Sequence, residues 1–554
     1  MIKLEDLTLR EKIGQLLMVR SSSLMFKING NNWELRDREE VAEILRNNPY
    51  GSVFSAGYIN MHTDNMAEKS EGRRCTIEEH KEWISFLNQN LRIPLLVGVD
   101  CENGTGGIFE DGTRTVGGFS VGAADSEDLS FRLNAAICTE VKASGANWRW
   151  YPIADLPSRF DNSLGRCYSS FPDRLVPLCG AAIKGSESAG VVSTLKHFPG
   201  EDSHEFRDSH MVTTSIISSF EEWEQTQGVI FKEIIANGVD SVMVGHQAFS
   251  AVDDEEINGK VIPATCSKKI VTDLLRERYG FKGVIITDGL GMGSLKAVGD
   301  VEERYVRMIN AGNDVLLGVY PEDLDVVYNA VLKGRIPMER IDESCQRVLE
   351  LKEKIGLFAE DKKIDLVEAR QNTEKVSREI AEKSITLLYD RNELFPLKKE
   401  NVKKVAIMCT SHDPDMLKKL DTMIEEFEKR GAEVTIMDKP TLDLHLDQVA
   451  ETHDLILYVA YVGMHSPLGF PTLYGEQAHC YFTAFGYGKE KSVGISLGYP
   501  YLHYDVMQNA ETFINAYSPA PTVQAAIVKA MYGEIGFDGV SPTDLEPKLR
   551  SFYC

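Results

Sequence analysis

The stretch "GVIITDG" at residues 283–289 is an apolar, β-branched run that ends in an aspartate and a glycine. Its length and composition suit a strand that is buried on both faces. Six further runs have the same character: 51–59, 94–100, 147–156, 191–198, 240–246 and 313–319. Helical patterns such as 126–145 and 221–238 separate the runs and end near glycines, which suit helix C-termini. Alternating strands and helices predict a parallel sheet with right-handed crossovers.

Ionisable side chains stand at the ends of most of these runs. They are Asp100, Asp155, Lys196 with His197, His246 and Asp288. Buried parallel strands rarely tolerate charge, whereas catalytic groups gather at the carboxyl ends of barrel strands. An open, doubly wound sheet also binds ligands at that edge. We therefore expect a (β/α)8 TIM-like barrel of class α/β, whose eighth strand is irregular or lies nearer the N-terminus.

The chain of 554 residues is too long for one hydrophobic core. A charged helical stretch at 360–384 is followed by a second, shorter α/β pattern. Its apolar runs lie at 402–410, 432–438, 454–462, 491–499 and 511–518, before a last helix at 522–536. The sequence predicts a catalytic barrel over 1–359, a helical connector over 360–384 and a smaller α/β sandwich domain over 385–554.

Composition excludes several kinds of partner. The formal net charge of -24 argues against nucleic acid and anionic membrane surfaces. Residues 1–20 read as an amphipathic helix without the features of a secretory signal, and no run of about 18 apolar residues exists. The ten cysteines are scattered, which favours reduced thiols and a cytoplasmic protein. Nothing in the sequence indicates an oligomeric state.

The segment "LKHFPGEDSHEFRDSH" at residues 195–210 concentrates histidines and carboxylates. One interpretation is a metal-dependent barrel hydrolase that uses some of five ligands suited to zinc: His197, His204, His210, Asp202 and Asp208. Four of the five fall in one loop, whereas metal ligands usually sit on rigid elements. The other interpretation is acid/base catalysis by His210, because imidazole titrates near neutrality and a carboxylate two residues earlier orients it.

Several motifs together resemble one enzyme family. "LKHFPG" followed by "DSH", and then "FKGVIITDGLGMGSL" at 281–295, is similar to glycoside hydrolase family 3 and, within it, to the β-N-acetylglucosaminidase branch. "VGVDCENG", "LGRCYSSF" and "AYSPAPTVQAAIVKAMYGEIGFDG" support the resemblance over most of the chain. It implies a barrel followed by an α/β sandwich, and retaining release of terminal N-acetylglucosamine from a small carbohydrate, without cofactor or metal.

The resemblance also implies residue roles. Asp288 is the implied nucleophile, and His210 is the acid/base, paired with Asp208. The implied sugar-binding residues are Asp100, Arg166, Lys196 and His197, with His246 as a further candidate. The family usually has six residues between "KHFPG" and "DSH", but this chain has seven, 201–207. His204, with Asp202 two residues before it, therefore competes with His210 for the acid/base role.

Other functions stay open at this stage. A β-glucosidase or β-xylosidase of the same family takes its acid/base glutamate from the second domain, where Glu476 is available. A catalytically silent sugar-binding protein is another alternative. Phosphorolysis is a variant of the reaction, because a histidine repels incoming phosphate less than a carboxylate does. The sequence does not indicate the aglycone.

Overall fold

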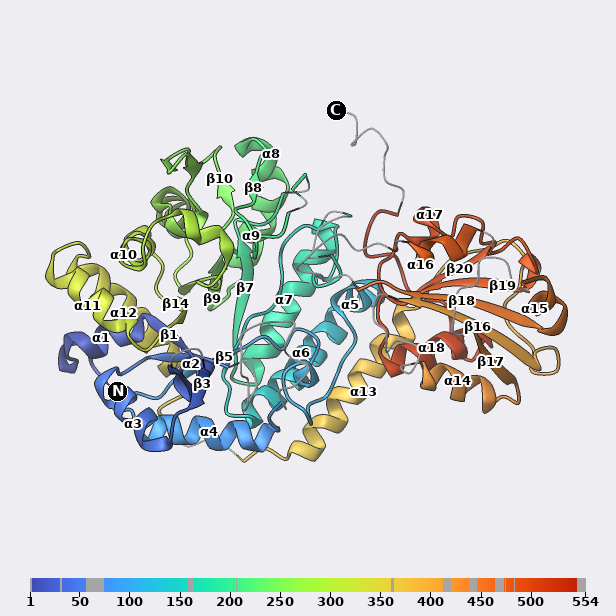
Figure 1. Cartoon of the computed structure of the whole chain (residues 1–554), viewed down its shortest axis with the longest axis horizontal. Coiled ribbons are helices and arrows are strands. Elements are labelled where there is room, and N and C mark those ends of the chain that lie inside the picture. The colour runs from blue at the N-terminus through green and yellow to red at the C-terminus, as the bar shows by residue number, and fades with distance from the viewer. Residues whose placement is uncertain are drawn as a thin grey trace. The chain divides into compact units, whose positions relative to one another are not determined.

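The computed structural model describes residues 2–29, 32–55, 74–157, 159, 164–202, 204–205, 207–359, 363–411, 420–437, 446–463, 473, 475–482 and 484–545 (Figure 1). The chain divides into two compact units. Unit 1 holds residues 1–114, 130–156 and 179–373, and unit 2 holds 115–129, 157–178 and 374–554. The sequence pattern does not indicate the two early segments of unit 2. The domain boundaries at 359 and 385 stay a prediction.

Unit 1 is built on an eight-stranded parallel sheet. Its strands, in spatial order, are β1 (Leu17–Arg20), β4 (Ser52–Phe54), β5 (Leu96–Val99), β6 (Trp148–Arg149), β7 (Val192–Phe198), β9 (Ser241–Val244), β13 (Val284–Thr287) and β14 (Leu316–Val319). β1 pairs with β14, and a parallel bridge from Ile286 to Val315 joins β13 to β14. Every strand thus has two neighbours, which closes the sheet and confirms the predicted barrel.

The first strand corrects the sequence prediction for residues 1–20. The helix α1 (Leu9–Gln15) begins at Thr8, whose side chain accepts a hydrogen bond from the Glu11 backbone N–H, and it ends before β1. Residues 16–19 are fully buried. A run that is apolar on every face fits a strand between two others better than the end of an amphipathic helix.

Helices and short elements connect the barrel strands. The helices are α2 (Ser21–Met25), α3 (Arg38–Asn47), α4 (Ile77–Gln89), α6 (Glu127–Ala143), α7 (Pro172–Ser188), α8 (Phe220–Gln225), α9 (Gln227–Ala236), α10 (Val301–Ala311), α11 (Asp323–Leu332), α12 (Met338–Lys354) and the π-helix η5 (Lys269–Arg278). Three two-stranded sheets pair β2 (Phe26–Asn29) with β3 (Asn32–Leu35), β8 (Ser215–Ile216) with β10 (Ala248–Phe249), and β11 (Glu256–Ile257) with β12 (Lys260–Val261). The predicted helix at 221–238 is two helices, because the backbone breaks at Thr226.

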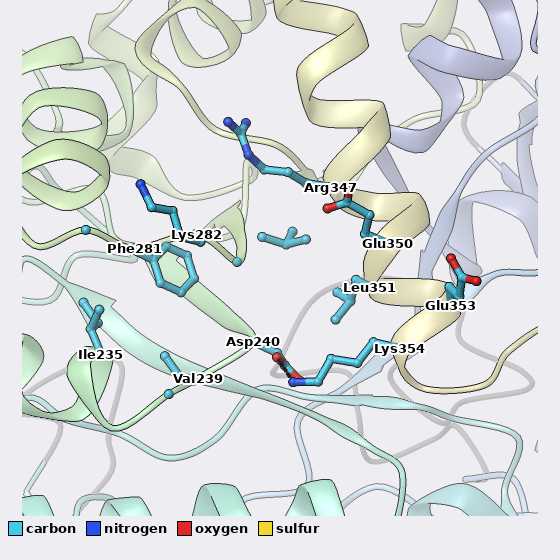
Figure 2. A pocket seen from close by; sticks show the side chains of 14 residues that line it. Ile235, Val239, Asp240, Phe281, Lys282, Arg347, Glu350, Leu351, Glu353 and Lys354 are labelled. Carbon is cyan, nitrogen blue, oxygen red and sulfur yellow. Dashed lines mark hydrogen bonds and ion pairs between the residues drawn. The ribbon is translucent and has the colours of Figure 1, made fainter. Parts of the chain in front are cut away.

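The amino ends of β9 and β13 border a cavity of about 670 Å³ (Figure 2). Its wall includes Val239, Phe281 and Leu351, and Lys354 of α12 forms an ion pair with Asp240 at 2.5 Å. The ionisable strand-end residues lie at the carboxyl ends instead. This cavity therefore lies at the end of the barrel away from the predicted site.

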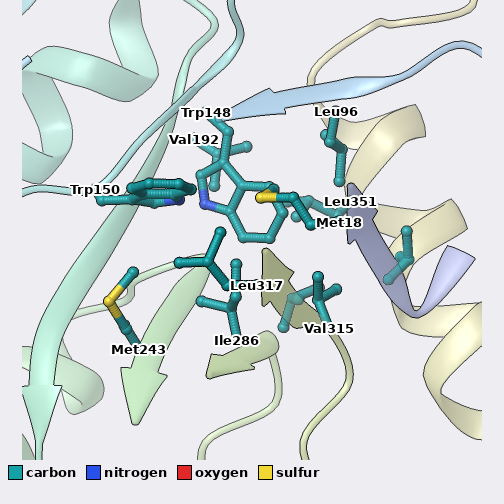
Figure 3. Close-up of a cluster of buried hydrophobic side chains, with 12 residues drawn as sticks. Met18, Leu96, Trp148, Trp150, Val192, Met243, Ile286, Val315, Leu317 and Leu351 are labelled. Atoms are coloured by element: carbon teal, nitrogen blue, oxygen red, sulfur yellow. The ribbon is translucent and has the colours of Figure 1, made fainter. Parts of the chain in front are cut away.

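The barrel interior is packed with side chains and is not a channel (Figure 3). The cluster contains Met18, Leu96, Trp148, Trp150, Val192, Met243, Val284, Ile286, Val315 and Leu317 from or beside the strands, with Val348 and Leu351 from α12. The Trp148 indole N–H donates to the Thr194 hydroxyl at 2.6 Å, which satisfies a buried polar group. A filled barrel leaves the carboxyl ends of the strands as the place where a ligand meets polar groups.

Unit 2 contains a six-stranded sheet in the order β15-β20-β19-β18-β16-β17. The strands are β15 (Thr386–Asp390), β16 (Lys404–Ser411), β17 (Glu433–Met437), β18 (Leu455–Tyr461), β19 (Ser492–Ser496) and β20 (Thr512–Asn515), and only β15 runs antiparallel to its neighbour. Its helices are α5 (Gly118–Ala124), α14 (Asp421–Glu428), α15 (Leu446–Thr452), α16 (Glu476–His479), α17 (Leu502–Asp505) and α18 (Pro521–Met531), and α13 (Leu366–Ser384) precedes β15. All five predicted runs are strands. In the described chain, no helix has the length and hydropathy to cross a bilayer.

Candidate active site

Asp288 follows β13 directly and lies at the carboxyl end of the barrel. Its backbone N–H donates to the Val244 carbonyl at 2.8 Å, and its Oδ1 accepts from the Gly289 N–H at 2.6 Å. Burial raises the pKa of Asp288, but the charge of the His197 imidazole and the Gly289 N–H help to reverse this shift, and the net change is downward. The side chain is therefore an anionic carboxylate at neutral pH.

His197 is fixed by a buried carboxylate from the segment that follows the neighbouring strand β6. Its Nδ1 lies 2.7 Å from Asp155 Oδ2, and its backbone N–H donates to Asp155 Oδ1 at 3.1 Å. Asp155 is fully buried. The carboxylate occupies Nδ1 and leaves Nε2 for a ligand. Asp155 was not among the predicted site residues, although its place at a strand end indicated it.

Lys196 forms ion pairs with two acidic residues after β5. Its Nζ lies 3.0 Å from Asp100 Oδ1 and 3.0 Å from Glu102 Oε1. The lysine side chain is 4% exposed, whereas that of Asp100 is 43% exposed. The lysine thus orients Asp100, which keeps oxygen atoms accessible to a sugar hydroxyl. Sequence reasoning missed Glu102, whose signal is its place two residues after the strand-end aspartate.

His246 is fully buried, and both of its ring nitrogens have protein partners. Nδ1 lies 2.9 Å from the Thr265 hydroxyl, and Nε2 lies 3.2 Å from the Gly289 carbonyl oxygen. A carbonyl only accepts, so Nε2 carries the proton and Nδ1 accepts from the threonine. Burial lowers the pKa of His246, although Asp288 opposes the shift. These contacts favour a neutral histidine whose role is to position the loop after Asp288. They do not favour the sugar contact that the sequence predicted.

Asp208 and His210 form a dyad on the loop after β7. His210 Nδ1 lies 2.7 Å from Asp208 Oδ1, and the same oxygen accepts from the His210 backbone N–H at 2.8 Å. The His210 carbonyl accepts from the Gly293 N–H at 2.8 Å, five residues after Asp288. The charge of His210 contributes to lowering the pKa of Asp288. The loop is thus docked on the segment that follows Asp288, and its imidazole lies within electrostatic range of that carboxylate.

Asp202 and His204 form a second dyad with the same local geometry. His204 Nδ1 lies 3.0 Å from Asp202 Oδ1. However, Asp202 Oδ2 also accepts from the Ile217 N–H at 2.9 Å, the Ser218 N–H at 3.0 Å and the Ser218 hydroxyl at 2.7 Å. Burial raises the pKa of Asp202, and the His204 and Ser218 hydrogen bonds reverse that shift, so the net change is downward. The charge of His204 contributes to lowering the pKa of Glu222 in α8. Asp202 therefore ties the two ends of the loop together.

Three other sequence predictions concern a metal ion, Arg166 and Glu476. The five predicted metal ligands form the separate pairs described above, and no three His, Cys, Asp or Glu side chains converge on a common point within the described residues. Arg166 is half-buried in unit 2, so its sugar contact stays a prediction. Glu476 begins α16 in unit 2, but its side chain lies outside the described part of the structure.

Comparison with known proteins identifies the family of the barrel. Residues 8–351 match the model of the glycosyl hydrolase family 3 N-terminal domain. A β-N-acetylglucosaminidase/β-glucosidase of Cellulomonas fimi is 27% identical over 503 residues, which cover 85% of this chain and 87% of that protein. A β-hexosaminidase of Tolumonas auensis is 30% identical over 299 residues, which cover 53% of this chain and 81% of that protein.

Solved structures extend the similarity to both units. A β-glucoside phosphorylase has 25% identity and a TM-score of 0.82, with coverage of 98% of this chain and 94% of that one. A family 3 β-N-acetylglucosaminidase from Paenibacillus sp. has 26% identity and a TM-score of 0.78, with coverage of 97% and 99%. Because the family model spans more than half of the sequence, this chain belongs to glycoside hydrolase family 3.

Proposed function

We propose that this protein is a retaining exo-β-N-acetylglucosaminidase, which releases terminal N-acetylglucosamine from β-glycosides. One observation carries the proposal: His210, oriented by Asp208, is docked through Gly293 within electrostatic range of the anionic Asp288. A carboxylate nucleophile facing a protonated acid is what retaining glycoside hydrolysis requires. The names of the Cellulomonas fimi and Paenibacillus relatives support N-acetylglucosamine as the sugar.

In the first step, an oxygen of Asp288 attacks the anomeric carbon, and the bond from that carbon to the leaving-group oxygen breaks. His210 gives its Nε2 proton to the departing oxygen. Asp208 holds Nδ1, which directs Nε2 outward and stabilises the imidazolium before transfer. The product of this step is a covalent glycosyl ester on Asp288.

In the second step, His210 acts as the base. It takes a proton from water, whose oxygen attacks the anomeric carbon and displaces Asp288. Asp100, Lys196 and His197 hold the sugar through its hydroxyl groups, with Arg166 as a fourth contact. The ion pairs of Lys196 and the Asp155–His197 contact orient these groups in advance, so little ordering is needed when substrate binds.

A panel of aryl β-glycosides tests the proposal. The wild-type protein should cleave the N-acetylglucosaminide faster than the glucoside and the xyloside. Asp288→Ala should lose several orders of magnitude in turnover with each of them. His210→Ala should retain far more activity on a nitrophenyl glycoside than on an unactivated disaccharide, because a nitrophenolate leaves without protonation. His204→Ala is the matched control, and a leaving-group effect in that variant alone would overturn the assignment.

A second candidate is phosphorolysis, which the similarity to a β-glucoside phosphorylase favours. In that reaction phosphate takes the place of water in the second step, and a histidine base repels it less than a carboxylate does. Turnover with and without phosphate, followed by the appearance of sugar 1-phosphate, separates the two reactions. A leaving-group effect in Glu476→Ala alone would instead indicate a β-glucosidase or β-xylosidase.

We also propose that the protein acts in the cytoplasm on small carbohydrates rather than on nucleic acid or membranes. The net charge of -24 supports the choice of partner. The nine cysteines at described positions are buried and free, which suits a reducing compartment. Fractionation of the cells that naturally produce the protein, with detection of the protein in each fraction, tests the location. The proposal expects it in the cytoplasmic fraction.

A further inference from the structure

Two large apolar side chains follow His210 and are exposed to solvent. Met211 is 59% exposed and Val212 is 40% exposed, and the His210 side chain itself is 49% exposed. Single exposed apolar residues are common on protein surfaces. Two exposed apolar residues in succession beside a group that must meet substrate are less common. Because they are exposed, polar residues at these positions would cost the loop no packing.

The loop holds these two residues over the carboxyl end of the barrel. On one side, the Gly293 N–H donates to the His210 carbonyl, and the Thr213 hydroxyl donates to the Ser294 carbonyl at 3.1 Å. On the other side, the Ala248 N–H donates to the Thr214 carbonyl at 2.9 Å, which begins the β8–β10 pair. Residues 211–212 thus lie between contacts to the segments that follow β13 and β9.

The position of the acid decides what these side chains meet. A general acid must lie within hydrogen-bond distance of the leaving-group oxygen, so the rest of the leaving group extends past the residues next to it. The charges just before these two residues are paired, since Arg207 forms an ion pair with Glu205 at 2.5 Å and Asp208 pairs with His210. Beside His210 the loop therefore offers two apolar side chains that are preceded by paired charges.

We propose that Met211 and Val212 form the aglycone-binding site, and that it selects neutral, apolar aglycones of the alkyl or aryl class. This inference rests on the proposed roles of Asp288 and His210. An apolar aglycone gains binding free energy by covering both side chains, because apolar surface is removed from water. The high negative charge of the protein disfavours an anionic aglycone. The two residues determine specificity and take no part in bond making.

The experiment compares octyl and methyl β-N-acetylglucosaminides, whose alcohols have similar acidity but different apolar area. In the wild type, kcat/KM for the octyl glycoside should exceed that for the methyl glycoside by about tenfold or more. Val212→Thr, which preserves shape, and Met211→Asn should lower this ratio, the second by about tenfold. Met338→Asn is the matched control, a methionine 40% exposed on α12, and should leave the ratio at its wild-type value.

Three results would overturn the inference. A wild-type ratio near one, or equal losses on both glycosides in Met211→Asn, would show that these residues only shape the loop. A disaccharide cleaved more efficiently than the octyl glycoside would show that the site prefers a sugar. Failure of the proposed function gives a different pattern, since no N-acetylglucosaminide is then cleaved. The octyl-to-methyl comparison on β-glucosides would still test the aglycone site in that case.

Discussion

Asp202→Asn should release the loop that carries His210 while the barrel stays folded. Asp202 lies at the start of this loop, and its Oδ2 accepts three hydrogen bonds from Ile217 and Ser218 at the other end. Its Oδ1 accepts from the His204 backbone N–H at 2.8 Å. An asparagine has one acceptor oxygen, so it must face one of these two sets of donors with its own NH2 group.

The cost follows from the number of bonds lost. If the asparagine oxygen keeps the three contacts to Ile217 and Ser218, the His204 backbone contact is lost and the remaining bonds no longer have a charged acceptor. Hydrogen bonds to charged groups contribute about 1.5–3 kcal/mol each, so the closed loop loses roughly 2–4 kcal/mol. At about 1.4 kcal/mol per factor of ten, this is a shift of roughly 30- to 1000-fold toward an open loop.

Leaving-group dependence is the assay. An open loop removes the acid but leaves Asp288 in place, so kcat/KM for an unactivated disaccharide should fall by about 10- to 100-fold, and that for a nitrophenyl glycoside by less than about threefold. The loss should appear in kcat and leave KM nearly unchanged, because the acid acts only in the transition state. Proteolysis of the native protein should also become faster within residues 202–218.

Asp253→Asn is the matched control. Asp253 and Asp202 are both 4% exposed, and Asp253 accepts from the Ser267 hydroxyl at 2.6 Å and pairs with Lys269 at 3.0 Å, away from the loop. That variant should lose stability without a leaving-group effect. Equal losses on both substrates in Asp202→Asn, or the same signature in Asp253→Asn, would refute the anchoring role.

Three further predictions concern other parts of unit 1. Lys352 is fully buried against Gln15, and burial lowers its pKa from 10.5 to about 7. As pH rises, the folded state therefore releases this proton before the unfolded state does. The free energy of unfolding should then rise between pH 7 and 10.5, by at most about 1.4 kcal/mol per pH unit. Lys352→Met should flatten that slope when stability is measured by urea titration at each pH. Asp314→Asn should cost about 3–5 kcal/mol in calorimetry, because three arginines lose their buried counter-ion. A Cβ at Gly293 would lie 2.3 Å from the Met211 carbonyl oxygen, so Gly293→Ala should slow disaccharide cleavage more than nitrophenyl glycoside cleavage.

Much of the fold follows from local patterns. The run 283–289 and its six counterparts each contain a strand, because apolar, β-branched residues suit a position buried on both faces. The same reasoning misassigned residues 16–19, since a short apolar run after a helical pattern reads as more helix until its neighbours are known. Strands β1 and β14 are far apart in sequence, and only their pairing shows that the N-terminal run closes the barrel.

The grouping of residues 115–129 and 157–178 with unit 2 also depends on tertiary contacts. In unit 2, a Cβ at Gly118 would lie 2.5 Å from the Arg166 carbonyl oxygen, and the Ser169 hydroxyl donates to the Pro542 carbonyl. These contacts join residues separated by dozens to hundreds of positions. Composition and periodicity describe only neighbours along the chain, so no local pattern could indicate this grouping.

The strand-end rule placed Asp100, Lys196, His197 and Asp288 together because parallel strands bring their carboxyl ends to one edge. It did not distinguish His246 from the sugar-binding candidates, although its hydrogen bonds to Thr265 and Gly289 make it a buried positioning group. Burial and hydrogen-bond partners depend on the surrounding elements, and the identity of a residue at a strand end does not contain that information.

The two Asp-Ser-His segments show most clearly what depends on local sequence and what depends on tertiary contacts. A hydrogen bond from an aspartate to the histidine two residues later depends on local backbone geometry, so Asp202–His204 and Asp208–His210 both form it. Both dyads can therefore be predicted from the local sequence. Which of the two dyads meets the segment after Asp288 depends on where the loop backbone is docked, and the contact between His210 and Gly293 joins segments that are distant along the chain. This choice between the dyads requires the folded barrel, because the contact can form only once the ends of β7 and β13 lie at the same edge.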